Sequence, residues 1–599
     1  MYIMKYYLIV VFLFNLVFYS NATKVDYAVK MTKPQSHYFE VMMTIDDLSG
    51  KNITIKMPVW SPGSYMIREF SKNVNIVRAF DESANKLPIV KTTKNTWVIK
   101  RNGAKQIRVK YEVYSFELSV RSTFLDATHG FINGSSLFMF VEGSTESSGK
   151  IDIYPHEDFS TITTSLNKPV DSIRYEGAKT FEYKNYDELI DSPIEIGNQE
   201  VFEFKAAGCD HTVALYGVGN YEISKLQNDM KKIVETTTKI IGVNPNKKYT
   251  FIIHNVNDGQ GGLEHANSTT LSVSRWGYTG KDYLDFLSLV AHEYFHLWNV
   301  KRLRPIELGP FNYDQENYTS LLWVMEGFTS YYDELILRRA GYLSEQDYLQ
   351  KFNSTLNYLE STEGRNVQPV AHASFDAWIK AYRPNENSSN TTISYYTNGH
   401  VLGALLDAKI IAKYNGERCL DDFMRLLYRK FYLKENRGFT EKEFEETLTS
   451  FLKEDMSIFL NDHVYDTKIP DYKTIFGNIG IKFDQITTNK ISFGCSFDKN
   501  NENPKVRSIK VNSKAEEAGL SVNDEIIAIN GFRVNSEIIE ETINSFKEND
   551  KLSFIVSRDG IIIEINAEAG VIEHKTYKLS TDFASEKTNL ISYWLRTDN

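Results

Sequence analysis

Residues 290–305 read "VAHEYFHLWNVKRLRP" and place two histidines and a glutamate within five positions of an otherwise apolar stretch. Apolar residues recur at helical spacing through this region and Asp282 is a candidate N-cap, so the segment is predicted to be a helix. His292 and His296 then lie on one helix face, close enough for both imidazoles to reach one cation. Glu293, one step round the helix, is predicted to project beside that cation.

Zinc is the metal that fits this pattern. Imidazole suits a borderline-soft divalent ion, and catalytic zinc takes three protein ligands and a water. The expected third ligand is Glu326 in the apolar stretch "YTSLLWVMEGFTSYYDELILRRAG", because a buried carboxylate needs a partner. Glu316 is nearer in sequence and is the rival ligand, but "YDQENYT" is typical of a polar helix entrance. We therefore predict one Zn²⁺ per chain, bound by His292, His296 and Glu326.

The alternative interpretation makes both histidines core side chains that are satisfied by hydrogen bonds. A lone histidine would favour it, whereas the glutamate between the pair and Glu326 further on favour a metal site. A metzincin site also needs a glycine and a third histidine soon after His296, and "HLWNVKRLRP" has neither. The site is therefore expected to be of the gluzincin type.

A carboxylate beside a zinc ion predicts acid–base chemistry. Zinc lowers the pKa of a bound water to about 7, and a neighbouring carboxylate can take its proton and pass it to a leaving amine. Glu293 fits this role. The predicted reaction is hydrolysis of an amide bond.

The rest of the chain divides into regions with different periodicity, and 599 residues exceed what one hydrophobic core supports. Residues 23–205 alternate apolar and polar positions in short runs, as in an all-β, sandwich-like domain. Residues 206–465 combine an edge sheet with longer helical patterns and form the predicted catalytic domain. Residues 471–570 return to strands, and residues 571–599 are a C-terminal tail. The expected fold class is multidomain α+β.

The composition argues against several partners. The chain has 68 basic and 78 acidic residues, a formal charge of −10, and no long run of either sign. Nucleic acid and anionic membranes are therefore not expected partners. The three cysteines, Cys209, Cys419 and Cys495, are an odd number spread over three regions, so stability is expected from packing and metal.

The first 22 residues are predicted to be a secretory signal peptide. Lys5 precedes an apolar run, and Ser20-Asn21-Ala22 has the small residues of a cleavage site. The run is shorter than the roughly 20 residues of a membrane anchor. No later segment is long and apolar enough to span a bilayer, so we expect an exported protein, periplasmic or extracellular, without a membrane span in the mature chain.

Four separated motifs follow one another along the chain: "PVWSPGSYMIREF" (58–70), "GGLEH" (261–265), "HEYFHLWNVKRLRP" (292–305) and "LLWVMEGFTSYY" (321–332). In kind and order they resemble the glycyl aminopeptidase family of zinc metallopeptidases, whose members carry a PDZ domain. The resemblance covers nearly the whole mature chain. It implies an N-terminal β domain, a thermolysin-like catalytic domain, a C-terminal PDZ module and substrates with small first residues.

The resemblance also implies how the substrate amine is bound. Related larger aminopeptidases hold it with the glutamate of a Gly-x-Met-Glu-Asn motif, and Gly261-Gly262-Leu263-Glu264-His265 takes that place here. Gly261 and Gly262 would let the backbone approach a substrate closely. Glu264 is expected to pair with the ammonium group and to restrict cleavage to the first peptide bond. The alternative is a turn glutamate exposed to water.

The stretch "SYYTNGHVLGALLD" resembles the aminopeptidase segment whose tyrosine stabilises the oxyanion. Tyr396 matches better than Tyr395 by its position before Asn398-Gly399. The alternative is a packing role, since the chain has 36 tyrosines. Where thermolysin has an aspartate that holds a ligand histidine, this chain has Ser330, so that group is expected to come from elsewhere.

The stretch "VNSKAEEAGLSVNDEIIAINGFRV" resembles a PDZ domain, which captures an extended chain end by β-augmentation. The earlier "IFGNIGIKF" is expected to supply the carboxylate-binding loop through Gly477, Ile479, Gly480 and Ile481, because glycines allow successive amides to point one way. A PDZ domain used only for packing is the alternative.

These features together predict an exported zinc aminopeptidase that hydrolyses the first peptide bond of peptides with a free N-terminus and a small first residue, glycine or alanine. A second hypothesis keeps the zinc but makes the protein an endopeptidase or oligopeptidase that captures substrates with its PDZ domain. A third, non-enzymatic hypothesis is a PDZ interaction scaffold with a structural or idle metal site. Peptide or protein C-termini are the expected partners of the PDZ domain.

Overall fold

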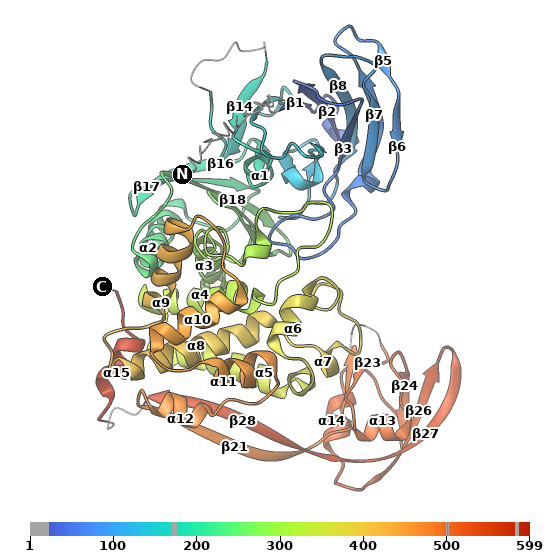
Figure 1. Cartoon of the computed structure of the whole chain (residues 1–599). Helices are drawn as coiled ribbons and strands as arrows, with labels where there is room; N and C mark the ends of the chain where they lie inside the picture. The colour runs from blue at the N-terminus through green and yellow to red at the C-terminus, as the bar shows by residue number, and fades with distance from the viewer. Residues whose placement is uncertain (1–22, 170–176, 499, 501, 582–585, 599) are drawn as a thin grey trace, which may run out of the picture.

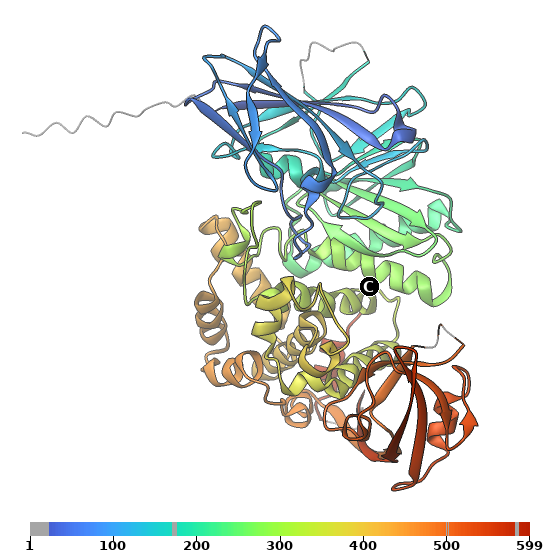
Figure 2. The same cartoon turned by 90° about the vertical axis from the view of Figure 1, so that its right-hand side faces the viewer.

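The structure is a computed structural model that describes residues 23–169, 177–498, 500, 502–581 and 586–598. The predicted signal peptide, residues 1–22, lies outside the described residues. Among the described helices, none has both the length and the apolar character needed to cross a membrane. An N-terminal β region, a central sheet with a helical lobe, and a C-terminal β region follow one another through the molecule (Figures 1 and 2).

The N-terminal region is built from strands with alternating burial. In β2 (Tyr38–Asp46) every second side chain is buried, including Phe39 and Val41, because successive residues of a strand face opposite sides of the sheet. β2 pairs antiparallel with β1 (Lys24–Lys30) and β8 (Ile107–Tyr114). The expected β domain is present.

The described residues of this region form one seven-stranded and two four-stranded sheets. The first also contains β14 (Lys179–Tyr183), β12 (Gly149–Tyr154), β4 (Val74–Phe80) and β5 (Lys86–Leu87). The second contains β13 (Thr161–Thr164), β15 (Ile194–Gly197), β10 (Gly130–Ile132) and β9 (Phe124–Leu125). The third contains β11 (Phe140–Val141), β3 (Asn52–Lys56), β7 (Thr96–Lys100) and β6 (Ile89–Lys91).

The central sheet carries the predicted amine-binding strand at its edge. Its order is β16 (Glu200–Ala206), β17 (Cys209–Tyr216), β18 (Lys248–Val256), β20 (Ser268–Ser274) and β19 (Gln260–Glu264). β18 lies parallel to both neighbours and is buried along almost its whole length, as expected of a parallel strand that is covered on both faces. β19 runs antiparallel to β20 and has one free edge.

Helix α3 (Gly280–Phe295) carries the motif that opened the sequence analysis and packs against β19 and β20. Its predicted N-cap, Asp282, was wrong. The residue before the helix is Thr279, and Asp282 lies in the first turn, where a carboxylate still interacts favourably with the helix dipole.

The helical lobe surrounds one long central helix. α8 (Tyr395–Lys413) is apolar on nearly all sides and is buried accordingly. The short helix α1 (Tyr186–Ile190) packs in the core of the N-terminal region. The other helices of the central part are α2 (Ile223–Ile241), α4 (Phe328–Arg339), α5 (Glu345–Ser361), α6 (Val370–Phe375), α7 (Ser388–Thr391), α9 (Leu420–Leu427), α10 (Glu441–Leu452), α11 (Ser457–Leu460), α12 (Tyr472–Gly477) and, near the C-terminus, α15 (Thr588–Trp594).

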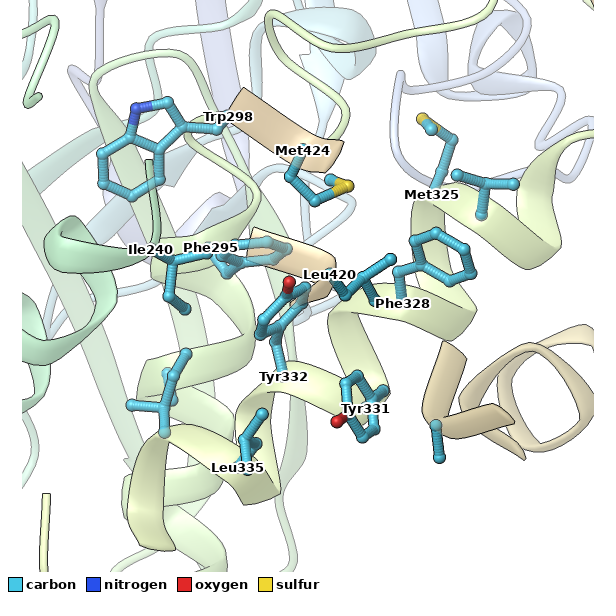
Figure 3. Close-up of a cluster of buried hydrophobic side chains, with 14 of the residues drawn as sticks. Ile240, Phe295, Trp298, Met325, Phe328, Tyr331, Tyr332, Leu335, Leu420 and Met424 are labelled. Atoms are coloured by element: carbon cyan, nitrogen blue, oxygen red, sulfur yellow. The ribbon is translucent and has the colours of Figure 1, made fainter. Parts of the chain in front are cut away.

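A tightly packed cluster joins α3 to this lobe (Figure 3). The Phe295 ring, at the end of α3, lies 4.6 Å from the Tyr332 ring of α4, and Leu420 of α9 completes the group. Phe295 immediately precedes His296. Its burial therefore fixes how α3 is rotated, which keeps His292 and His296 turned towards α4.

Two glycines allow the backbone before α4 to touch α8. A Cβ on Gly327 would lie 2.3 Å from the Cα of Gly399, so neither position has room for a side chain. Gly327 ends a π-helical turn, Trp323–Gly327, of the kind often found at functional sites. The contact brings Glu326, on the π turn, close to Tyr396, on the first turn of α8.

The C-terminal β region has a core of its own. Its sheet has the order β22 (Cys495–Asp498), β23 (Lys505–Ile509), β24 (Glu525–Ile529), β26 (Lys551–Arg558) and β27 (Ile561–Glu568), and β25 (Phe532–Arg533) pairs with β24. Two short helices, α13 (Lys514–Ala518) and α14 (Ile539–Asn544), pack on it. The order of strands and helices agrees with the predicted PDZ domain.

The structure places the residues of the predicted carboxylate-binding loop outside the core of this domain. Gly477 ends α12, and Ile479 is fully buried in the core of the helical lobe rather than in the PDZ core. Gly480 is a turn residue, and Ile481 begins β21 (Ile481–Ile491), which pairs with β28 (Val571–Thr581) in a separate two-stranded ribbon. The glycine–hydrophobic pattern from which the loop was predicted marks the start of this ribbon.

Two asparagines hold the ribbon against the helical lobe. Asn353 and Asn357 lie one turn apart on α5. The Asn353 amide donates to the Leu579 carbonyl (3.1 Å) and accepts from the Leu579 N–H (2.7 Å). Asn357 makes the same pair of bonds with Tyr577, at 2.8 and 2.7 Å. The side chains thus satisfy the outer edge of β28 as a neighbouring strand would.

Replacing both asparagines, Asn353→Ala with Asn357→Ala, is expected to detach β28 from the lobe. Each unsatisfied backbone group costs about 1–3 kcal/mol when it stays buried. We expect faster amide exchange along β28 and a lower melting temperature. Ser354→Ala is the control, because its hydroxyl donates within the helix to Gln350. Unchanged exchange in the double variant would contradict this assignment.

Candidate active site

The structure brings the three predicted metal ligands together. His292 Nε2 and His296 Nε2 lie 3.6 and 3.2 Å from Glu326 Oε2. Ligands about 2.0–2.1 Å from a tetrahedral zinc ion are about 3.3 Å apart, so the donor set and its spacing fit zinc. Glu326 is buried, with 2% of its surface exposed. Glu316, the rival, belongs to none of the possible ligand clusters among the described residues.

The other ring nitrogen of each histidine is occupied. His292 Nδ1 lies 2.9 Å from Asp333 Oδ2, and His296 Nδ1 lies 2.6 Å from the Asn299 carbonyl oxygen. These contacts orient both rings and leave Nε2 for a metal. Asp333 is the orienting group that was expected from elsewhere. Asp333 lies two helical turns after Glu326, whereas the comparison with thermolysin pointed to Ser330, one turn after it.

Asn299 links the end of α3 to the π turn. Besides its carbonyl contact with His296, its side-chain amide donates to the carbonyls of Val324 (2.9 Å) and Met325 (3.0 Å). Asn299 is fully buried. One residue therefore positions a ligand histidine and the backbone just before Glu326.

The charges of the two central glutamates differ because their surroundings differ. Burial alone would raise the pKa of Glu326, but the imidazoles of His296 and His292 outweigh it and lower the pKa to about 2. Burial raises the pKa of Glu293 to about 7, against the effect of the same imidazoles and with that of Glu264 and Glu326. Glu293 can thus both take and give a proton near neutral pH.

The Glu293 carboxylate is bare on one side and covered by backbone on the other. Its Oε2 is buried and has no hydrogen-bond partner among the described residues. A Cβ on Gly262 would lie 2.2 Å from Oε1, so β19 passes directly against this carboxylate. Glycine at 262 is required for that approach to Glu293, whereas the sequence predicted a close approach of this backbone to a substrate.

Glu264 is not an exposed turn residue. It ends β19 with 4% of its surface exposed, and its carboxylate, that of Glu293 and His296 have ligand atoms within 4.8 Å of one another. Gly63, from the N-terminal "PVWSPGSYMIREF" motif, packs against it, since a Cβ there would lie 2.5 Å from Glu264 Oε1. Tyr65 of the same motif is buried, and burial, with Glu326 and Glu264 nearby, raises its pKa.

The Tyr396 side chain lines the cavity that contains the metal ligands, whereas Tyr395 does not. The Tyr396 ring centroid lies 6.3 Å from that of His292, and Tyr395 stacks on Tyr396 at 4.7 Å. Burial raises the pKa of Tyr396, and the charge of Glu326 acts in the same direction. Its phenol therefore keeps its proton and can donate a hydrogen bond.

The three metal ligands line one cavity of about 480 Å³ together with Glu264, Glu293, Asp333 and Tyr396. Carboxylates outnumber cations around it, so it favours a positively charged ligand group. One cation comes from the N-terminal β region: Arg121, whose guanidinium lies 3.5 Å from the Gly262 carbonyl oxygen. Sequence reasoning missed Arg121, because no motif surrounds it and only the fold brings it to the site.

Three family profiles match the chain. They describe the peptidase M61 N-terminal domain (residues 26–198), the M61 glycyl aminopeptidase (285–402) and a PDZ domain (477–568). No protein of curated function matches the sequence.

Solved structures are also similar to the chain. An aminopeptidase N family protein from Idiomarina loihiensis has 29% identity and a TM-score of 0.87, over 96% of this chain and 100% of that one. An M1 zinc metallopeptidase from Deinococcus radiodurans has 12% identity and a TM-score of 0.48, over 75% and 95%. Yeast LTA4 hydrolase has 15% identity and a TM-score of 0.48, over 76% and 70%.

Fold, site and profiles together define a zinc metallopeptidase, a hydrolase of peptide bonds. Within that class the chain belongs to the M61 glycyl aminopeptidase family and carries its PDZ domain. The family, the fold class and the enzyme class predicted from the sequence are confirmed.

Asp333→Ala is expected to weaken metal binding about 10- to 100-fold, because the group that orients His292 is lost. The measurement is zinc affinity by titration against a competing chelator. Ser330→Ala, at the position where thermolysin has its aspartate, should leave the affinity unchanged. Equal affinity of the Asp333 variant and the unmodified protein would show that His292 is oriented by other contacts.

Proposed function

We propose that the protein is an exported, zinc-dependent aminopeptidase that removes small N-terminal residues, glycine or alanine, from peptides. One observation carries the proposal: Glu264, Glu293 and His296 meet within 4.8 Å beside the pair His292–Glu326. A group for binding an ammonium ion and a group for moving a proton are thus adjacent. Export is supported by the sequence of residues 1–22.

His292, His296 and Glu326 would hold one Zn²⁺. When bound, the ion acts as a Lewis acid that polarises a carbonyl group and lowers the pKa of water to about 7. The protein's own part is to keep both Nε2 atoms unprotonated and turned inwards, through Asp333 and the Asn299 carbonyl.

Glu293 is proposed to move the proton. Its carboxylate takes a proton from the attacking water and delivers it to the amine that leaves when the C–N bond breaks. A pKa of about 7 suits both halves of this task, because neither proton transfer is then strongly uphill. Burial keeps bulk water away from the exchange.

Tyr396 is proposed to stabilise the oxyanion, because its protonated phenol faces the cavity beside His292. The glycine backbone of β19 would lie alongside the substrate, since the free edge of this strand offers its own N–H and C=O groups. The hydrogen bond from the phenol strengthens as negative charge develops on the substrate oxygen.

Glu264 is proposed to bind the substrate's α-ammonium group. Its carboxylate is buried near Glu293, and Gly63 packs against it. Glu264, Gly63 and Tyr65 also line a further cavity of about 380 Å³. Pairing with the ammonium group supports cleavage after the first residue, and the preference for a small first residue rests on the resemblance to the glycyl aminopeptidase family.

Glu293→Gln should lower kcat about 10²- to 10⁴-fold, because the amide cannot carry the proton. Zinc content and melting temperature should stay close to those of the unmodified protein, since glutamine has the same shape. The measurements are hydrolysis of an alanine arylamide and metal analysis. Full activity in this variant would contradict the role of Glu293, whereas no hydrolysis of any substrate by the unmodified protein would favour the scaffold hypothesis, with an idle metal.

The unmodified enzyme should cleave a free-amine peptide at least about 10²-fold faster than its N-acetylated twin, because acetylation removes the charge that Glu264 binds. In Glu264→Gln this ratio should collapse, mainly through the free-amine substrate. Equal rates for the two peptides in the unmodified enzyme would instead identify an endopeptidase.

A further inference from the structure

A second cavity, of about 800 Å³, adjoins the active site. It lies between the helical lobe and the C-terminal β domain. Tyr396 lines both cavities, so a chain leaving the catalytic groups on the side away from Glu264 can enter the second one. The mechanism proposed above leaves this space unused.

The outer wall of this second cavity is held in a fixed position. The Asn390 side chain, from α7, donates to the Ile509 carbonyl (2.7 Å) and accepts from the Val511 N–H (3.2 Å). Lys510 forms an ion pair with Glu363 at 2.6 Å. β23 accordingly lies beside α7 (Figure 1). The domain is docked with its β22–β23 hairpin facing the lobe.

The wall has the features of a peptide-binding surface. β22 is the edge strand of the PDZ sheet, and Gly494, Cys495 and Ser496 line the cavity. An edge strand offers unpaired N–H and C=O groups to an extended chain. Across the cavity lie aromatic rings of the lobe, among them Tyr358 and Tyr382, which can cover apolar parts of a peptide.

Cations outnumber carboxylates around the cavity, because Lys380, Arg507 and Lys510 line it with Glu386 and with Glu363, which pairs with Lys510. Arg507, on β23, is exposed and lines the cavity, and no side-chain partner of its guanidinium occurs among the described residues. Lys380, on the lobe side, is only loosely paired with Asp376, at 3.6 Å. A guanidinium with free donors binds a carboxylate through two parallel hydrogen bonds.

We propose that this cavity binds the C-terminal part of the same peptide whose N-terminus lies at Glu264, with the terminal carboxylate at Arg507. This inference rests on the proposed aminopeptidase function. It narrows the substrates to oligopeptides with both ends free, and it makes the PDZ domain a wall of the substrate site. The edge of β22 then replaces the loop at Gly477–Ile481 that the sequence suggested.

The test uses the full-length enzyme and three kinds of substrate: an alanine arylamide, an alanine-initiated peptide series of increasing length with a free carboxylate, and the same series as C-terminal amides. We expect the free acid to be preferred about 10-fold in kcat/KM at the best length. Arg507→Gln should remove this preference by raising KM for the acid and should leave arylamide hydrolysis unchanged.

The matched control is Arg533→Gln, an exposed arginine on β25 that pairs with Glu502 and does not line the cavity. It should keep the preference for the free acid. Loss of the preference in both variants would indicate a general charge effect and overturn the assignment of Arg507.

Three further outcomes would overturn the inference in distinguishable ways. Intact arylamide hydrolysis with equal rates for acids and amides at every length overturns this inference alone, whereas no hydrolysis of any substrate overturns the proposed function as well. The third outcome is an N-acetylated peptide with a free carboxylate that binds without slowing arylamide or peptide hydrolysis. It would show that the PDZ domain binds the C-terminus of a separate protein rather than that of the substrate.

Discussion

The active site depends on one buried negative charge. Glu326 lies in a π turn with almost no exposure, and a carboxylate in such a place is costly unless cationic or metal partners surround it. Two imidazoles meet that requirement from α3, and their rings are fixed in turn by Asp333 and Asn299. The cluster stays together because its parts come from elements that pack on one another through Phe295 and Tyr332.

The sequence was most informative where a helical repeat and a chemical requirement coincide. On a helix, the spacing of four residues between the two histidines, with a glutamate between them, determines how their side chains lie relative to one another. The apolar sequence around Glu326 indicated a buried charge. Tyr396 could be chosen over Tyr395 only through the resemblance. The structure agrees with that choice by placing Tyr396 at the cavity wall.

Other features could not be predicted, because they depend on contacts between distant segments. Nothing near Arg121 indicates a site, and the motif around Gly63 indicates the family but not a contact with Glu264, since the N-terminal region brings both residues to β19 only after folding. Asp333 was not predicted, because the orienting group was expected four residues after Glu326, at Ser330. The π turn changes the register between Glu326 and α4. Glycine–hydrophobic patterns occur at Gly477–Ile481 and again at Phe493–Cys495, so the pattern alone does not identify the PDZ loop, and only strand pairing distinguishes the two segments.

The asparagine contacts on α5 have a consequence for self-association. Four helix residues advance about 6 Å and two strand residues about 6.8 Å, so side chains at i and i+4 can match alternate residues of a strand. Asn353 and Asn357 use this near-coincidence to occupy the β28 edge, which would otherwise be open to a strand from another molecule. A helix here guards against aggregation without adding a strand to the sheet.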